Sequence, residues 1–230
     1  MEPEPAASSR TRSKPRSAKG RARATFERLS DVYPGTAKEL CELDHRDAYE
    51  LLVATILSAQ TTDARVNMVT PELFARWPDA KALAEAPTAE VEQVLQSTGF
   101  YRQKTKSVQG MARKLLEDFD GEVPHSIEDL TTLPGMGRKT ANVIRSVGLD
   151  EPGLPVDTHV LRLSKRLGLT DEVDPVKVEK DLNRLLPPKD WGLFSERVIL
   201  HGRRVCDARK PRCDECVLND FCPAAFRAGR

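Results

Sequence analysis

The sequence predicts an all-α protein, on three observations. From Phe26 onward, apolar residues recur mainly at the three- and four-residue spacing of a helix, while alternating strand patterns are scarce. Aromatic residues make up only 5% of the 230 residues, which disfavours a β-sandwich and favours helices packed through aliphatic side chains. Sixteen prolines divide the pattern into short segments. We therefore expect a protein built from many short helices.

Four segments carry individual helix signals. Helical apolar spacing covers residues 49–57, 143–147 and 160–167. Gly148 and Gly168 directly follow the last two segments and predict where those helices end. Ser126, with Asp129 three residues later, predicts the N-cap and capping box of a short helix that runs through Leu130.

The first 23 residues differ in composition from the rest of the chain. They hold seven basic and two acidic side chains without apolar periodicity, so residues 1–23 are expected to form a disordered basic arm. The arm either adds nonspecific affinity for phosphates or is a solubilising tail. Glu2, Glu4 and the missing apolar face disfavour a transit peptide. Because the whole chain has a net charge of +1, residues 24–230 are net acidic, and any nucleic-acid contact must come from local basic patches.

No segment predicts export or a membrane span. The N-terminus lacks the apolar stretch of a secretory signal, and the longest apolar runs, such as Leu51 to Leu57, are too short to cross a bilayer. We therefore expect a cytoplasmic protein with no membrane partner.

Four of the five cysteines crowd into one segment near the C-terminus. Their spacing is Cys206-x6-Cys213-x2-Cys216-x5-Cys222, whereas Cys41 stands alone and is expected to be a small buried apolar residue. In a chain without an export signal, such crowding indicates metal ligation rather than disulfides. Zinc and an iron–sulfur cluster both suit four thiolates, and the single Cys-x2-Cys pair modestly favours iron–sulfur.

Positive charge is dense around the first of these cysteines. The loop between Cys206 and Cys213 and the residues just before it carry one acid, Asp207. They carry five basic side chains: Arg203, Arg204, Arg209, Lys210 and Arg212. In a net-acidic body this patch is interpreted as a phosphate-contacting surface, and a solvated charged face is the alternative.

The segment Leu133 to Thr140, with the sequence LPGMGRKT, lies between two predicted helices. Gly135 and Gly137 allow a tight turn and leave no Cβ in the path of a ligand. The next helix begins there, so its free N–H groups, with Arg138 beside them, are predicted to contact DNA phosphates. An ordinary turn between two helices is the alternative.

This segment resembles the helix–hairpin–helix of the endonuclease III superfamily of DNA glycosylases. The resemblance extends from about Ala24 to Phe226. It includes, in the expected order, LSAQTTD at 57–63, GFYRQK at 99–104, VDTHV at 156–160 and the cysteine loop. It implies two helical domains that flank a cleft: a six-helix domain of residues 41–151, and an iron–sulfur domain of residues 24–40 and 152–230.

The resemblance also implies a base-excision glycosylase with AP-lyase activity and a 4Fe-4S cluster on the four clustered cysteines. It places the nucleophilic lysine at Lys139 and the catalytic carboxylate at Asp157. It further places Gln60 in the space left by an extruded base, and Phe100, where relatives often have leucine, as a wedge in the opposite strand. A polar helix-end residue and a core aromatic are the respective alternatives for Gln60 and Phe100.

The lyase chemistry explains why both an amine and a carboxylate are needed. A neutral amine attacks C1′ of the damaged nucleotide, displaces the base and forms a Schiff base, after which β-elimination breaks the strand. A place in the first turn of a helix is expected to favour neutral Lys139, while Asp157 assists deprotonation and stabilises the cationic transition state. An exposed helix lysine and a simple N-cap are the alternatives for the two residues.

The expected substrate is duplex DNA that carries oxidised pyrimidines such as thymine glycol, bound by a monomer on the bacterial nucleoid. Adenine and mismatch glycosylases share the hairpin, the aspartate and the cysteine loop, but they generally lack the lysine. The adenine enzymes also place a glutamate before the position of Gln60, whereas residues 51–62 contain no Asp or Glu. A noncatalytic DNA-binding iron–sulfur protein is a further alternative, which the presence of both Lys139 and Asp157 disfavours.

Overall fold

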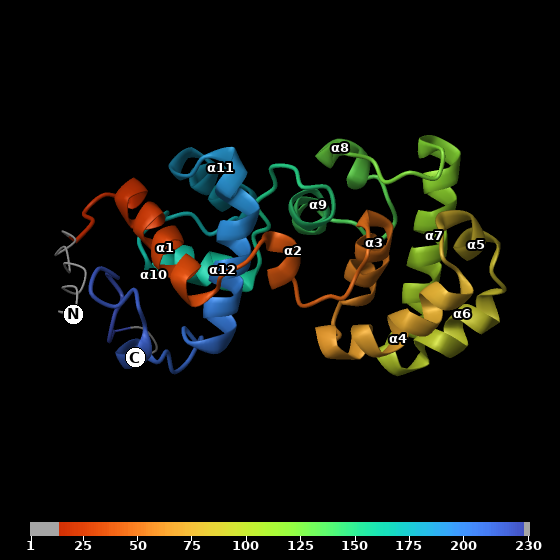
Figure 1. The fold of residues 1–230 in the computed structure, drawn as a ribbon, viewed down its shortest axis with the longest axis horizontal. Helices are drawn as coiled ribbons and strands as arrows, with labels where there is room; N and C mark the ends of the chain where they lie inside the picture. The colour runs from red at the N-terminus through yellow and green to blue at the C-terminus, as the bar shows by residue number, and fades with distance from the viewer. Residues whose placement is uncertain (1–13, 228–230) are drawn as a thin grey trace, which may run out of the picture.

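The structure, a computed structural model, describes residues 14–227. Within that range every regular element is a helix or a helical turn, which confirms the predicted all-α class. The helices gather into two lobes along the long axis of the molecule (Figure 1). None of the described helices has the length and apolar character that a bilayer crossing requires.

The first lobe is built from the middle of the chain. Its helices are α3 (Ala48–Leu57), α4 (Asp63–Arg76), α5 (Ala80–Glu85), α6 (Thr88–Leu95), α7 (Tyr101–Phe119), α8 (Ile127–Leu130) and α9 (Arg138–Val143), with the 3-10 turn η1 (Gln96–Thr98) and the π-helical turn η2 (Ile144–Gly148). One hydrophobic core joins these helices, and Leu51, Leu73 and Met111 are fully buried in it. Burial of such aliphatic side chains is the main force that holds the lobe together.

The second lobe combines segments from both ends of the described chain. Its elements are α1 (Ala18–Val32), α2 (Ala37–Leu40), α10 (Thr158–Arg166), α11 (Pro175–Leu185), α12 (Trp191–Arg204), η3 (Pro188–Asp190) and η4 (Cys213–Glu215). Its separate core contains Leu29, Leu163 and Phe194, and α2 lies where the two lobes meet (Figure 1). Because the cores divide in this way, residues 41–151 stay one proposed domain. The other, predicted as residues 24–40 with 152–230, begins earlier, since Ala22 of α1 lies in its core.

The predicted end of the basic arm at residue 23 is wrong. Helix α1 already begins at Ala18, where the Ser17 side chain caps its first turn. Arg21 then anchors the turn, since its guanidinium donates to the carbonyls of Leu167 and Gly168 at 2.7 and 2.5 Å. This contact with the C-terminal end of α10 is long-range and therefore invisible in composition. Residues 1–13 of the predicted arm lie outside the described residues.

Three of the individually predicted helices are confirmed. Helix α3 spans the first segment, Gly168 with φ of 63° follows α10, and the Ser126 hydroxyl caps α8 through the Asp129 amide at 2.9 Å. The remaining prediction is wrong in helix type, because the chain continues beyond α9 as the π-helical turn η2. There the Ser146 hydroxyl donates to the Asn142 carbonyl at 2.8 Å. This side-chain bond competes with the backbone N–H that the carbonyl would accept in a regular α-helix.

Two kinds of contact fix one lobe against the other. Arg138 on α9 donates Nε and Nη2 to the buried Glu179 carboxylate on α11, each at 2.8 Å, and Asn142 Nδ2 donates to the same carboxylate at 3.2 Å. The second contact is steric: a Cβ added to Gly192 on α12 would lie 2.4 Å from the Cβ of Ser146 on η2. The lobes therefore meet through a charge-assisted polar contact and a close backbone approach.

We expect Gly192→Ala to lower the free energy of unfolding by about 1–3 kcal/mol, because the new methyl group overlaps a Cβ that cannot move without the backbone. Gly110→Ala in α7 is the matched control: a Cβ there makes an ordinary 3.4 Å contact with Pro134, so alanine should be neutral or mildly stabilising. Denaturant unfolding of both variants measures the difference. Equal stability of the two variants would contradict the steric account of the lobe junction.

Candidate active site and metal centre

A pocket of about 70 Å³ lies where the two lobes meet, and it brings Lys139 and Asp157 onto one cavity wall. Lys139 comes from α9 in the first lobe and Asp157 from the start of α10 in the second. The other lining residues include Thr55 and Ser58 from the end of α3 and its following turn, and Ile199 from α12. Two sequence motifs thus meet at a cavity that neither lobe forms alone.

Asp157 is held in place by the helix that it caps. Its Oδ1 accepts the backbone amides of His159 and Val160, both at 2.8 Å. Within the described residues Oδ2 has no hydrogen-bond partner, and the side chain lines the pocket. One carboxylate oxygen therefore satisfies the N-terminal turn of α10, as expected for an N-cap, while the other is available to a ligand.

Lys139 is the second residue of α9, which begins directly after the hairpin glycines. Lys139 is exposed, and its amine has no ion-pair or hydrogen-bond partner in the described part of the chain. An amine that is not committed to a protein partner is free to approach an electrophile at the mouth of the pocket. The pocket mouth, rather than a buried cage, is therefore the place where this group can react.

Glu196 is a third ionisable group in the same pocket, and the sequence analysis missed it. It lies within α12, is only 8% exposed and has no hydrogen-bond partner among the described residues. Burial raises the pKa of this carboxyl to about 7, while positive Lys139 and Arg203 act in the lowering direction and Asp157 and Glu42 in the raising direction. Nothing in the local sequence of α12 distinguishes this glutamate from a surface residue.

Cys41 also lines this pocket rather than a purely apolar core. Burial raises the pKa of its thiol to about 12, and the neighbouring Glu196 carboxylate adds to the shift. The residue is therefore a neutral thiol at physiological pH, which is unreactive as a nucleophile.

Gln60 and Phe100 lie on two exposed turns that are bonded to each other. Both residues have left-handed backbone, with φ of 54° and 46°, and the Phe100 side chain is 70% exposed, so its alternative as a core residue is wrong. The Thr61 hydroxyl donates to the Thr98 carbonyl at 2.6 Å and joins the turns. A left-handed conformation is uncommon for non-glycine residues and is retained at functional sites more often than elsewhere.

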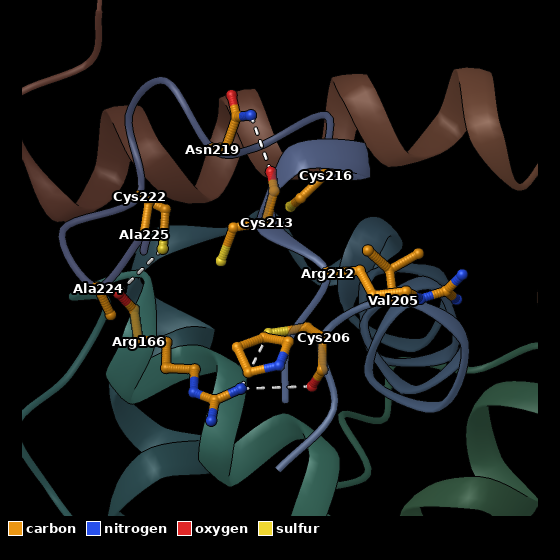
Figure 2. Close-up of a pocket in the computed structure, with 11 residues that line it drawn as sticks. Arg166, Val205, Cys206, Arg212, Cys213, Cys216, Asn219, Cys222, Ala224 and Ala225 are labelled. Atoms are coloured by element: carbon orange, nitrogen blue, oxygen red, sulfur yellow. Dashed lines mark hydrogen bonds between the residues drawn. The ribbon is translucent and has the colours of Figure 1, made fainter. Parts of the chain in front are cut away.

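The four clustered cysteines line a second pocket, in the C-terminal loop, together with Arg166 from α10. Figure 2 shows their sulfur atoms pointing toward a common space. In the described part of the chain, no three His, Cys, Asp or Glu side chains are close enough to hold a single metal ion. Four thiols in one short loop are a donor set that an iron–sulfur cluster fits.

Donors from outside the loop contact these sulfur atoms. Arg166 Nη1 lies 3.2 Å from Cys206 Sγ, and His201 Nε2 lies 3.2 Å from Cys216 Sγ. Burial lowers the pKa of His201 to about 4, so the ring is neutral. With Tyr33 Oη at 3.4 Å from Nδ1, the tautomer protonated on Nε2 lets the ring donate to the sulfur. Such outer contacts stabilise thiolates and orient them.

The predicted basic patch is only partly available to a ligand. Arg203 and Arg204 form ion pairs with Glu42, and Arg203 also with Asp63 at 2.9 Å. Arg212 pairs with Glu215 at 2.9 Å. Within the described residues Arg209 and Lys210 are exposed and have no ion-pair partner. Outside this patch, Arg138, which was also expected to contact DNA, is committed to Glu179.

Comparisons with known protein families match both the segment that carries Lys139 and Asp157 and the cysteine loop. A family described as HhH-GPD superfamily base excision DNA repair protein matches residues 53–188, and the iron-sulfur binding domain of endonuclease III matches residues 206–222. The chain is 53% identical to endonuclease III of Synechocystis sp. over 210 residues, which cover 91% of this chain and 94% of the relative. The chain belongs to the endonuclease III family. It is therefore a DNA glycosylase and AP lyase of base excision repair.

Further members of the endonuclease III family agree in sequence and fold. Endonuclease III of Bacillus subtilis is 44% identical, with 86% of this chain and 89% of the relative covered. Solved structures of a non-covalent endonuclease III–DNA complex and of a trapped endonuclease III–DNA covalent intermediate are 39% and 40% identical. Each has a TM-score of 0.82 and covers 90% of this chain and 96% of its own. The predicted family, enzyme class and 4Fe-4S cofactor are confirmed, and the zinc alternative is set aside.

The raised pKa of Glu196 makes stability depend on pH in a defined direction. An unfolded glutamate ionises near 4.5, whereas the folded one ionises near 7, so the folded state loses stability as pH rises between these values. Glu196→Gln should remove this loss. The free energy of unfolding of the variant minus that of the parent should therefore increase by up to about 3 kcal/mol from pH 5 to pH 8. Denaturant unfolding of cluster-loaded protein at both pH values tests this, and a pH-independent difference would contradict it.

Proposed function

We propose that the chain excises oxidised pyrimidines of the thymine glycol type from duplex DNA and cleaves the strand through Lys139. The observation that carries the proposal is the shared pocket wall of Lys139 and Asp157. The Nζ lone pair attacks C1′, the electron pair of the glycosidic bond leaves with the base, and the base takes up a proton. Nζ then gives up a proton, and the C1′–O4′ bond breaks with its electron pair going to O4′, which takes up a proton. The opened sugar is held as a Schiff base, from which loss of a C2′ proton expels the 3′ phosphate.

Asp157 supplies negative charge where positive charge develops. Its Oδ1 is fixed by two backbone amides, so the carboxylate does not have to reorganise when C1′ becomes cationic. The same group can take the proton that Lys139 must lose before it attacks. A fixed carboxylate and an uncommitted amine are therefore assigned different tasks in one reaction.

DNA is expected to be gripped mainly through backbone amides at the hairpin. Gly135, with φ of 85°, is required by the turn itself. Gly137 has an ordinary φ, and a Cβ added there would meet nothing within 4 Å, so the fold gives no reason for glycine at that position. Close approach of a phosphate to the N-terminus of α9 gives such a reason. Arg209 and Lys210 add charge at a second place on the DNA backbone.

The exposed turns of Gln60 and Phe100 are assigned to the opened duplex. A base that has left the stack leaves a space, and an exposed side chain on a strained turn is suited to enter it. We assign Gln60 to that space and Phe100 to the opposite strand, where an aromatic ring can stack on bases.

Cys206, Cys213, Cys216 and Cys222 would hold the 4Fe-4S cluster. When bound, the cluster shapes the loop that carries Arg209 and Lys210, because ligation and folding are coupled in such loops. Arg166 and His201 stabilise the ligating thiolates through the contacts described above. We further propose that the protein acts as a monomer on the nucleoid.

Lys139→Ala should abolish the covalent complex that borohydride traps on a thymine glycol or abasic duplex, because the Schiff base requires this amine. Lys180→Ala, at an exposed position on α11, is the matched control and should trap like the parent. Trapping by the parent on abasic DNA alone would retain the lyase and refute the thymine glycol assignment. Undiminished trapping by Lys139→Ala would assign the nucleophile to another residue.

Gly137→Ala should weaken DNA binding without affecting stability, because its methyl group enters the path of a phosphate and touches no protein atom within 4 Å. We expect a loss of about tenfold in affinity for an abasic duplex, which corresponds to about 1.4 kcal/mol. Fluorescence anisotropy measures binding, and denaturant unfolding serves as the control. Unchanged affinity would argue against a backbone grip at this glycine.

A further inference from the structure

Lys104, in the first turns of α7, is a buried ammonium whose charge has no acidic partner in the described part of the chain. The residue is only 4% exposed, and burial lowers the pKa of its amine. Lysine is rarely buried without a counter-charge, because removal of an ammonium from water is costly. A position of this kind calls for a role beyond packing.

The two groups that hold this ammonium belong to the two exposed turns of the site. Lys104 Nζ donates to the Thr61 hydroxyl and, at 2.8 Å, to the Thr98 carbonyl. The same Thr61 hydroxyl donates its proton to the Thr98 carbonyl at 2.6 Å. The three residues therefore form a closed hydrogen-bonded triangle, called here the Lys104 cluster, in which the ammonium makes two hydrogen bonds and the Thr61 hydroxyl makes the third.

Each acceptor in the Lys104 cluster lies within two residues of an exposed residue with left-handed backbone. Thr61 directly follows Gln60, and Thr98 precedes Gly99 and Phe100, which have left-handed φ values of 68° and 46°. Thr98 is itself fixed, since its hydroxyl donates to the Leu95 carbonyl at 2.8 Å at the end of α6. The cluster therefore connects the backbone beside Gln60 to the backbone beside Phe100.

We propose that Lys104 is a positioning residue for base extrusion, whose buried ammonium sets the spacing between Gln60 and Phe100. The inference rests on the proposed function of those two residues. If both side chains enter the duplex together, their turns must keep one spacing before DNA arrives, because a loosely held pair would have to be ordered during binding. A hydrogen-bonded charge inside the protein holds that spacing without occupying the DNA-facing surface.

This role affects duplex DNA selectively. An abasic nucleotide in a single strand can reach Lys139 without a complementary strand to be parted or a space to be filled. An abasic nucleotide in a duplex requires both. Loss of the Lys104 cluster should therefore slow Schiff-base formation on duplex DNA and leave the same reaction on single-stranded DNA largely intact.

The test uses Lys104→Met, which keeps the length of the side chain and removes the ammonium. Lys106→Met is the matched control, since it removes an exposed charge two residues later on the same helix. Single-turnover borohydride trapping is measured with cluster-loaded protein on one abasic strand, alone and in a duplex. We expect Lys104→Met to lose about tenfold or more in duplex rate and to stay within about twofold on the single strand. Lys106→Met should keep the parent ratio of the two rates.

A second variant keeps the test decisive if Lys104→Met folds poorly. Thr61→Val retains the shape and the lysine but removes the hydroxyl from the Lys104 cluster, and it should give the same duplex-selective loss. Fluorescence of 2-aminopurine placed opposite the abasic site should also rise less on binding either variant than on binding the parent. Equal losses on both DNA forms, or unchanged rates in both variants, would overturn the proposal. If the parent traps neither the single strand nor the duplex, the role of Lys139 as nucleophile is refuted instead.

Discussion

The contact of Glu179 with Arg138 and Asn142 is the constraint on which the geometry of the active site depends. Lys139 follows Arg138 directly on α9, and Asp157 begins α10 in the other lobe. The amine and the carboxylate that we propose to react can therefore keep one relation only if α9 stays fixed against the second lobe. A bidentate arginine–carboxylate pair fixes direction as well as distance, because the two donors of the guanidinium match the two carboxylate oxygens, and Asn142 adds a third hydrogen bond. The close approach of Gly192 to Ser146 adds a second point of contact between the lobes.

The pocket enclosed in this way concentrates ionisable groups at the expense of stability. Glu196 is buried without a hydrogen-bond partner among the described residues. The same pocket holds three further acids and the positive charges of Lys139 and Arg203. Burial raises the pKa of this carboxyl to about 7, and a buried carboxyl of this kind beside other charged groups is typical of functional sites. Arg203 is shared between Glu42 and Asp63 at the pocket wall, so its charge is already committed. Among the described residues that line the pocket, Lys139 is the cation without an ion-pair partner.

Helices are the frame of this molecule, and most of the residues to which we assign a role lie where helices begin. Asp157 caps α10, Lys139 lies in the first turn of α9, and Phe100 immediately precedes α7. At a helix start, free amides and fixed capping geometry hold a side chain in one orientation, while the next turns bury their apolar face in a core. The cysteine loop is also positioned by helices, because side chains of α10 and α12 contact its sulfur atoms.

What the sequence by itself determined is local in origin. The helical class, the cap at Ser126, the N-cap role of Asp157 and the four-thiol segment follow from periodicity and spacing over a few residues, and the family resemblance added the pairing of Lys139 with Asp157. Only the tertiary structure decided that α1 begins before the predicted arm ends, that Arg138 binds Glu179 rather than remaining free, that Glu196 joins the pocket, and that Lys104 connects two turns. Each of these facts depends on contacts between segments far apart in the chain. The charge and polarity of a residue are written in the sequence, but its partner and its burial are set by packing.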